Sequence, residues 1–163
     1  MATGRTHDIV NLSFLPVAVY YLQPESFSGF ISGYLVGTFL ITPDNDIYHS
    51  KPNRRWKFFR FLWYPYTKLF SHRGVSHLPI IGSFIKLIYL FIVLSIFATF
   101  LISIMHFFWG VSVMENLKNI GKEEIFYIIK NPFVVSFLIG LVLAEIVHII
   151  TDVVYSSIKK VLR

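Results

Sequence analysis

An uncharged stretch from residue 87 to residue 114 constrains this chain more than any other feature of its sequence. Together with residues 78–85 it forms an apolar segment of about 30 residues, which only Lys86 interrupts. A helix of roughly 20 such residues crosses the hydrocarbon core of a bilayer. Charged residues make up 15% of the 163 residues and hydrophobic residues 55%, whereas average globular chains are roughly 25% charged. We therefore expect one domain that is embedded in a membrane.

A second apolar segment, residues 133–155, is also long enough to cross a bilayer. Two shorter apolar segments precede both spans, within residues 9–41, and are joined by the turn-like residues 23–26. As helices they reach only about 20 Å each, so they either cross a thinned bilayer or form a hairpin that enters and returns. Strand-like alternation is absent. The sequence thus predicts an all-α integral membrane bundle of about four helices, with spans over 78–109 and 133–155.

The basic residues are concentrated in one loop. Residues 47–77 contain no acidic residue, and their basic residues are Lys51, Arg54, Arg55, Lys57, Arg60, Lys68 and Arg73. Because cytoplasmic loops of membrane proteins are enriched in Lys and Arg, we expect this loop and both termini to face the cytoplasm. The Trp and Tyr residues between them are typical of a membrane-interface belt on anionic lipid. This topology explains the net charge of +6, so membrane lipid is the expected partner and nucleic acid is not.

Four short polar clusters lie at the ends of these segments, at residues 6–8, 43–46, 72–77 and 145–152. Taken singly, the first three have simple structural interpretations: a helix start, a polar turn after a helix, and interfacial histidines. The fourth has no such interpretation. Glu145, His148 and Asp152 lie at i, i+3 and i+7 on one helix face, inside an apolar segment where an ionisable group is costly unless it is paired. We therefore interpret this cluster as functional.

The placement of the four clusters indicates a shared role. The first begins the hairpin, the second ends it, the third opens the next helix from the cytoplasmic side, and the fourth closes the last helix as it returns there. All four therefore meet at the cytoplasmic end of the bundle. Five of the nine acidic residues and four of the six His residues belong to them. Converging carboxylates would repel one another and lose hydration, and divalent cations would remove both costs.

The clusters supply the predicted metal ligands His7, Asp8, Asp44, Asp46, His72, His77, His148 and Asp152. Because the chain has no Cys, only nitrogen and oxygen ligands are available, and they exceed what one tetrahedral zinc ion needs. The set suits about two divalent ions per chain, with zinc favoured and manganese or iron also compatible. Two such ions generate a hydroxide at neutral pH and stabilise a phosphoryl centre. We expect Arg73 to clamp a phosphate and Glu145, or an aspartate that is not a ligand, to accept the proton.

The order and spacing of these motifs resemble a family of bacterial membrane proteins described as metal-binding and of unknown function. The resemblance extends over essentially the whole chain and is carried by residues 4–8, 42–46, 54–56, 62–66 and 72–77, with His148 and Asp152. The chain also looks like a broader group of inner-membrane proteins described as hydrolases, and it is distantly similar to zinc-dependent phospholipase C and P1-type nucleases. The resemblance implies a multi-pass inner-membrane protein and metal-dependent hydrolysis, with phosphoesters as the first expectation. The phospholipases are much larger and not membrane-embedded, so their catalytic residues are not transferred.

The leading hypothesis is a membrane-embedded, cytoplasm-facing metal-dependent hydrolase of a phosphoester or lipid head group, with a phosphorylated amphiphile as its substrate. A metal transporter or sensor is a second hypothesis, although transport predicts ionisable residues throughout the membrane depth. A third is a bundle in which metal only staples short helices together. Open coordination positions would distinguish the enzyme from the staple. The sequence leaves the oligomeric state open.

Overall fold

The structure, a computed structural model, describes residues 2–70, 74–110 and 122–162. These residues form α-helices and short 3-10 helices (η), and no β-strand occurs among them. In order, the elements are α1 (Gly4–Leu22), α2 (Phe27–Phe39), η1 (Pro43–Asp46), α3 (Lys51–Arg55), η2 (Lys57–Trp63), α4 (Tyr64–Leu69), η3 (Val75–His77), α5 (Ile81–Trp109), α7 (Lys122–Lys130) and α8 (Pro132–Val161). The all-α prediction is thereby confirmed for this part of the chain.

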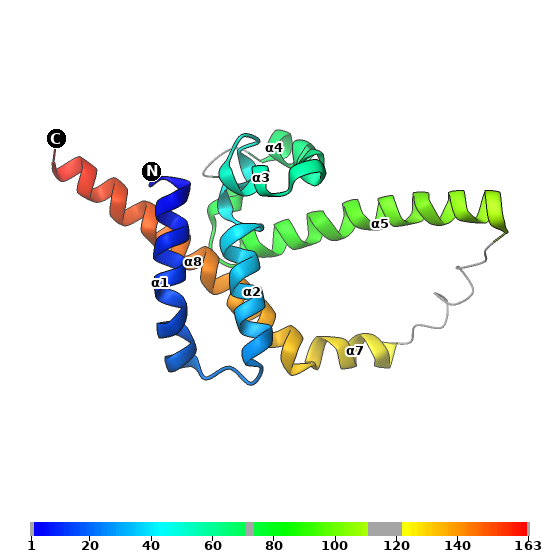
Figure 1. Cartoon of the computed structure of the whole chain (residues 1–163), viewed down its shortest axis with the longest axis horizontal. Helices are drawn as coiled ribbons and strands as arrows, with labels where there is room; N and C mark the ends of the chain where they lie inside the picture. The colour runs from blue at the N-terminus through cyan, green and yellow to red at the C-terminus, as the bar shows by residue number, and fades with distance from the viewer. Residues whose placement is uncertain (1, 71–73, 111–121, 163) are drawn as a thin grey trace.

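α1 and α2 form a helical hairpin in the predicted region (Figure 1). The side chain of Thr3 caps the start of α1 by accepting a hydrogen bond from the backbone N–H of Thr6. The helix ends at Gln23, which adopts the left-handed conformation with φ 43°. Ser26 caps α2 in the same way, through the backbone N–H of Gly29. The two helices run antiparallel, so the start of α1 and the end of α2 lie at the same end of the hairpin.

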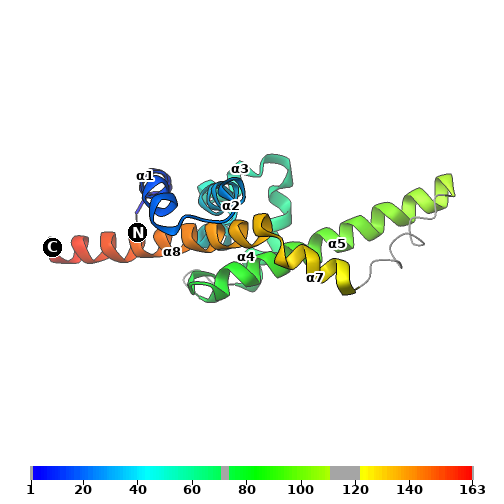
Figure 2. The same cartoon turned by 90° about the horizontal axis from the view of Figure 1, so that it is seen from below.

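α2 packs against α8 through glycines that let the two backbones approach closely. A Cβ atom added to Gly33 would lie 2.0 Å from the carbonyl oxygen of Phe137, and one added to Gly140 would lie 2.2 Å from that of Phe30. Only glycine fits at such crossing points, as is common between helices of membrane proteins. Figure 2 shows α8 running lengthwise with α1 and α2 on one side of it. This packing holds α8 beside the hairpin.

α5 and α8 are the two described helices that are long and apolar enough to cross a membrane. Their surroundings differ. In α8, 39% of the most apolar 18-residue stretch is buried inside the protein, whereas in α5 only 6% of the corresponding stretch is buried. α5 extends away from the other helices (Figure 1). It is apolar on all sides, so no face is preferred for packing against a neighbour. The prediction of a four-helix membrane bundle is therefore not confirmed: α1, α2 and α8 pack together, and α5 leaves them.

The short helices η2 and α4 form an aromatic layer that packs against the first turns of α5. Trp63 and Tyr66 are fully buried in it, and their rings meet edge to face with 5.4 Å between centroids. Tyr89 of α5 donates a hydrogen bond to the carbonyl oxygen of Leu62, which ties the layer to α5. The aromatic residues of the predicted membrane-interface belt thus have two different environments. Trp63 and Tyr66 are buried in a core, whereas Tyr64 is exposed.

Candidate metal centre

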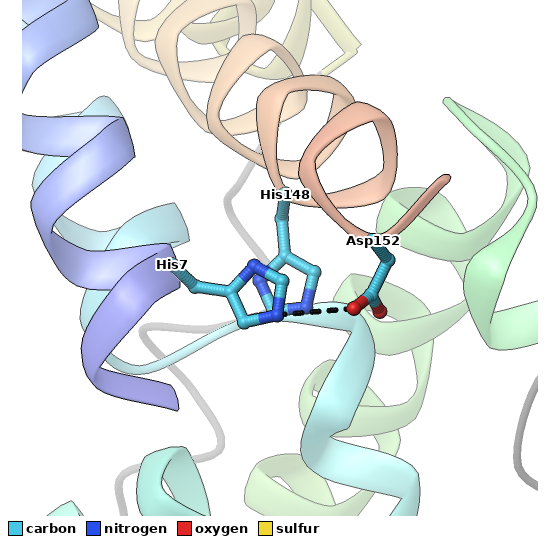
Figure 3. A group of neighbouring side chains, drawn as sticks. All are labelled: His7, His148 and Asp152. Carbon is cyan, nitrogen blue, oxygen red and sulfur yellow. Dashed lines mark ion pairs between the residues drawn. The ribbon is translucent and has the colours of Figure 1, made fainter. Parts of the chain in front are cut away.

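The polar face of α8 meets the start of α1. His148 and Asp152 are four residues apart on α8, about one helical turn, and both are buried. His7 of α1 lies against them, with its ring stacked on that of His148 at 3.7 Å between centroids and 5° between planes. The Nε2 atom of His7 lies 3.3 Å from Asp152 Oδ1. Figure 3 shows the three side chains converging from the two helices.

The short helices η1 and η3 bring Asp44 and His77 to the same place. His148 Nε2 lies 3.6 Å from one carboxylate oxygen of Asp44, Oδ2, and His77 Nε2 lies 3.8 Å from the other, Oδ1. Both distances are longer than ordinary hydrogen bonds. Asp44 therefore stands between a histidine of α8 and a histidine of the segment that precedes α5.

These five side chains form two sets of three potential metal ligands. One set is His7, His148 and Asp152, and the other is Asp44, His77 and Asp152; within each set the ligand atoms lie within 4.8 Å of one another. Asp152 belongs to both sets, so the two sets meet at its carboxylate. Nitrogen and oxygen donors of this kind bind zinc, manganese and iron.

Asp46 lies next to the second ligand set, on the Nδ1 side of His77, and orients the ring of that histidine. Its Oδ2 atom is 3.3 Å from His77 Nδ1 and accepts a hydrogen bond of 2.6 Å from the Ser76 hydroxyl. With Nδ1 facing Asp46, the Nε2 atom of His77 faces Asp44. A carboxylate behind a metal-ligating histidine fixes the ring and raises its basicity.

A pair of buried asparagines holds the turn that carries both aspartates of η1. Asn45 accepts a hydrogen bond of 2.5 Å from the backbone N–H of Thr42 and donates one of 2.7 Å to the side chain of Asn53. Asn53 in turn donates to two backbone carbonyl oxygens of the same segment. Both side chains are fully buried, where breaking such bonds is costly. The aspartates therefore project from a well-braced turn.

Burial and charged neighbours set the protonation of the centre. Burial alone would lower the pKa of His77, but Asp44 and Asp46 outweigh it and raise the pKa to about 9. Burial alone would raise the pKa of Asp44, but His148 and His77 outweigh it and hold the pKa well below its usual range. Burial, assisted by His148, lowers the pKa of His7. Without a metal ion, His77 thus carries a proton at neutral pH and His7 does not.

Several buried polar atoms of the centre make no hydrogen bond within the described part of the chain. They are both ring nitrogens of His7, Nε2 of His148 and Oδ1 of Asp44. An unsatisfied buried donor or acceptor costs about 1–3 kcal/mol, so three neighbouring residues with this property require an explanation. Metal ions bound between these atoms supply one. The donor set therefore fits divalent metal ions.

Asp8, a predicted ligand, lies outside both sets. It follows His7 in α1, and consecutive residues of a helix point about 100° apart, so its side chain is directed elsewhere. It forms ion pairs with Lys51 and Arg55 of α3. Burial alone would raise the pKa of Asp8, but these two cations outweigh it and lower the pKa. The structure thus places Asp8 in the contact between α1 and α3.

Glu145, a predicted catalytic residue, also lies outside both sets. Its Oε2 atom is 3.0 Å from Lys86 Nζ, and both side chains are fully buried. Lys86 also donates a hydrogen bond of 3.3 Å to the carbonyl oxygen of Ser76. The ion pair therefore joins α8 to the beginning of α5, close to the segment that carries His77.

Two predicted site residues, the ligand His72 and the phosphate clamp Arg73, lie outside the described residues. Of the predicted ligands that are described, five converge on the centre, Asp46 lies behind one of them, and Asp8 lies apart. Their roles as ligands, and the catalytic roles of Arg73 and Glu145, stay predictions.

Three contributions to the centre were not predicted from the sequence. The backbone N–H of Ala2 donates a hydrogen bond of 3.1 Å to Asp152 Oδ1, Ser76 donates to Asp46, and Asn53 braces the η1 turn. Ser76 lies inside the predicted cluster at residues 72–77, and this position could have identified it as part of the centre. A backbone amide and an asparagine within a basic loop give no comparable signal.

A cavity of about 340 Å³ lies beside the centre. His77 and Asp152 form part of its wall, together with apolar and serine side chains of α8. Its volume is within the range of pockets that bind small molecules, roughly 300–1,000 Å³. Two of the predicted ligands are therefore accessible from a space that a small molecule can enter.

Comparisons with known proteins agree with a metal centre. A family model described as "Uncharacterized metal-binding protein (DUF2227)" matches residues 2–162. An uncharacterised protein of Aquifex aeolicus (strain VF5) is 36% identical over 128 residues, which cover 78% of this chain and 90% of the relative. No solved structure matches. These comparisons do not show the wider resemblance to inner-membrane hydrolases, zinc-dependent phospholipase C or P1-type nucleases.

Proposed function

The chain belongs to the DUF2227 family of metal-binding proteins, and from that premise we propose that it is a membrane-embedded, metal-dependent hydrolase. It holds one divalent ion in each of the two ligand sets that share Asp152. It acts on a phosphoester or a lipid head group. Zinc is the favoured metal, and manganese and iron suit the same donors.

The cavity beside the centre is the observation that supports catalysis. A metal that only staples helices is closed by protein ligands, whereas a catalytic metal keeps a position for water or substrate. His77 and Asp152 line a cavity of about 340 Å³, so an ion held by them faces space that a substrate can occupy. Each set contains three protein ligands, the number that leaves a fourth position open in catalytic zinc sites.

In the proposed reaction, bound metal ions supply a hydroxide at neutral pH and positive charge beside the substrate. The residues that would hold them are His7, Asp44, His77, His148 and Asp152. Asp46 occupies the Nδ1 side of His77, so Nε2 stays directed toward Asp44, where it would ligate a metal ion. The backbone N–H of Ala2 holds the Asp152 carboxylate in place. The substrate enters through the cavity beside His77 and Asp152.

Arg73 and Glu145 differ in what supports a catalytic role. Arg73 remains the proposed phosphate clamp because it lies between His72 and His77 in the sequence. Glu145 is committed to a fully buried ion pair with Lys86, and it belongs to neither ligand set. This pair supports a role in neutralising Lys86 rather than in accepting a proton.

We further propose that α5 and α8 cross the inner membrane of a bacterium and that the centre faces the cytoplasm. The length and composition of the two helices support the crossing. The basic segment from Lys51 to Lys68 closely follows η1, which carries Asp44 of the centre, and basic loops face the cytoplasm. Membrane lipid is then the surrounding partner, and nucleic acid is not expected to bind.

A metal staple without catalysis is the second candidate. The origin of the ligands favours it, because they come from α1, η1, η3 and α8, and metal would fasten these elements together. The staple predicts that removing the metal unfolds the protein and that no substrate is turned over.

Turnover assays on the purified protein in lipid nanodiscs distinguish the two candidates. The substrates are phosphomonoesters, phosphodiesters and phospholipids, each offered with and without zinc. Wild type is compared with His148→Ala and with the control His49→Ala, because His49 lies beside Arg60 outside the centre. Zinc-dependent turnover that His49→Ala retains and His148→Ala loses supports the hydrolase. No turnover above that of His148→Ala on any substrate contradicts it, and the staple then becomes the leading candidate.

A further inference from the structure

We infer that an apolar groove next to the metal centre binds the hydrocarbon chain of an amphiphilic phosphate, whose phosphate group lies at the metal position. This inference rests on the proposed function and deepens it, because it assigns the apolar part of the expected phosphorylated amphiphile to a particular groove. The substrate is then a phosphorylated lipid-like molecule and not a water-soluble phosphoester.

The groove is a cavity of about 420 Å³ with an entirely apolar wall. Leu22 of α1, Ile80 and Phe84 at the beginning of α5, and five residues of α8 between Leu138 and Ile146 form this wall. Such a wall offers no hydrogen bond to a sugar, a nucleotide or a peptide. The gain that it offers is the burial of apolar surface, so the ligand that suits it is a hydrocarbon chain.

The groove and the metal cavity are neighbours along the same two walls. On α8, Ile146 lines the groove and Ile149 lines the metal cavity, and three residues of helix span only about 4.5 Å. On the facing wall, Ile80 lines the groove and His77, three residues earlier, lines the metal cavity. The two cavities therefore follow one another between α8 and the segment that leads into α5.

The α8 residues that line both cavities also share one side of that helix. Val142, Ile146, Ile149 and Val153 follow one another at intervals of three or four residues, which is the spacing of a single helical stripe. A hydrocarbon chain lying along this stripe has one end beside Asp152. The stripe thus offers apolar contacts to a hydrocarbon chain that leads away from Asp152.

The chemistry of the wall differs between the two neighbouring cavities. The metal cavity contains His77, Asp152, Ser156 and Ser157, whereas the groove has no polar side chain in its wall. A phosphate group is matched by the first environment and a hydrocarbon chain by the second. A small soluble phosphoester would use the metal cavity and leave the groove without a role.

Binding of alkyl phosphates of increasing length tests this inference. The probes are inorganic phosphate, butyl phosphate and octyl phosphate, titrated into the zinc-loaded full-length protein in detergent. Each buried methylene group strengthens binding several-fold. We therefore expect the affinity of wild type to rise by roughly 100-fold or more from inorganic phosphate to octyl phosphate.

A matched pair of variants distinguishes binding of the octyl chain in the groove from its entry into the detergent. Ile139 lines the groove and is 49% exposed, whereas Ile92 on α5 lines neither cavity and is 51% exposed. We expect Ile139→Trp, which fills the groove, to bind inorganic phosphate as wild type does and to bind octyl phosphate roughly tenfold or more weakly. Ile92→Trp should match wild type with every probe. Val142→Phe, which also fills the groove, repeats the test, and elemental analysis verifies that each variant retains zinc.

An equal gain with chain length in wild type, Ile139→Trp and Ile92→Trp would show that the octyl chain enters the detergent and not the groove, and this result would overturn the inference. Phosphate binding with no gain from the alkyl chain would also overturn it, while leaving the proposed function intact. If the zinc-loaded wild type binds none of the three phosphates, the proposed function fails together with the inference.

Discussion

The imidazole rings of His7 and His148 lie parallel with 3.7 Å between their centroids, although one ring belongs to α1 and the other to α8. Both residues are buried, and the Nε2 atom of each makes no hydrogen bond to the described part of the chain. Burying polar nitrogens in this way is unfavourable unless they gain partners. A metal ion bound by His7 and His148 would supply such partners.

Variants of single ligands should remove the two metal ions separately. His7→Ala and His77→Ala each damage one ligand set, whereas Asp152→Asn damages both. We expect about two ions per chain in wild type, about one in each histidine variant, and less than one in Asp152→Asn. Elemental analysis of protein purified without chelators measures these contents, and His49→Ala, whose ring lies beside Arg60, should match wild type. Metal-free wild type, or equal losses in His7→Ala and Asp152→Asn, would contradict the shared carboxylate.

Metal binding should release a proton from His77 at neutral pH. Burial alone would lower the pKa of this histidine, but Asp44 and Asp46 raise it to about 9, so the metal-free ring is protonated at pH 7 and the metal must displace that proton. Apparent affinity should therefore rise with pH, by roughly tenfold per unit, and level off above about pH 9.

Titration calorimetry in two buffers with different heats of ionisation measures the number of protons released. Asp46→Asn removes one of the charges that raise the pKa of His77, so fewer protons should be released from this variant near pH 8. Affinity that does not change between about pH 6 and pH 9 would refute this prediction.

Asp8→Asn separates a structural role from a ligand role. Because Asp8 pairs with Lys51 and Arg55, the variant should keep its full metal content and lose roughly 1 kcal/mol or less of stability. The pKa of Asp8, which burial alone would raise, is lowered by these cations. The stabilisation is thus present at neutral pH and is lost as the pH falls below about 4. Thermal unfolding of both proteins at neutral and acid pH checks the stability, and loss of metal would show that Asp8 is a ligand after all.

Gly33→Ala should separate α2 from α8. The added Cβ would lie 2.0 Å from the carbonyl oxygen of Phe137, and backbone shifts of this kind cost roughly 1–3 kcal/mol. Unfolding in a detergent series measures the loss. Ser28→Ala, at an exposed position of the same helix, is the control and should unfold like wild type. An equally stable Gly33→Ala would mean that the close approach of the two helices is not maintained.

Cysteine labelling tests the proposed topology, because the native chain has no Cys. Lys68 of α4 and Lys130 of α7 are both exposed, and α5 lies between them in the chain. Lys68→Cys should react with a membrane-impermeant reagent only from the cytoplasmic side, and Lys130→Cys only from the opposite side. Reaction of both positions from the same side would rule out a crossing by α5.

The centre is most predictable from the sequence where its ligands share one helix. His148 and Asp152 are four residues apart in an apolar segment, so the helical repeat alone places them side by side. His7 and Asp44 required one further step, since a hairpin brings its two outer ends together. Two helices separate His7 from Asp44, so the chain returns to the end at which it started. Their convergence could therefore be predicted without knowing any side-chain contact.

Contacts between separate segments could not be predicted in this way. Asp8 is adjacent to His7 in the sequence, and only the position of α3 explains its pairing with Lys51 and Arg55. Glu145 has its partner on another helix, and periodicity within one helix carries no information about that distance. The departure of α5 from the bundle has the same cause, because a helix that is apolar on every side gives no signal of where it packs.

Under the proposed crossing of the membrane by α5 and α8, the ion pair between Lys86 and Glu145 has a consequence for how the two helices are inserted. A charged side chain inside a membrane helix opposes insertion, by about 2.5–3.5 kcal/mol at the helix centre on translocon scales and by less near an end. Lys86 lies near the start of α5, and it is fully buried against Glu145 at 3.0 Å. Because α5 precedes α8 in the chain, Lys86 lacks its carboxylate partner until α8 has been synthesised. In the proposed topology the carboxylate of one span thus neutralises the lysine of the other, so the two spans are more stable in the bilayer together than singly.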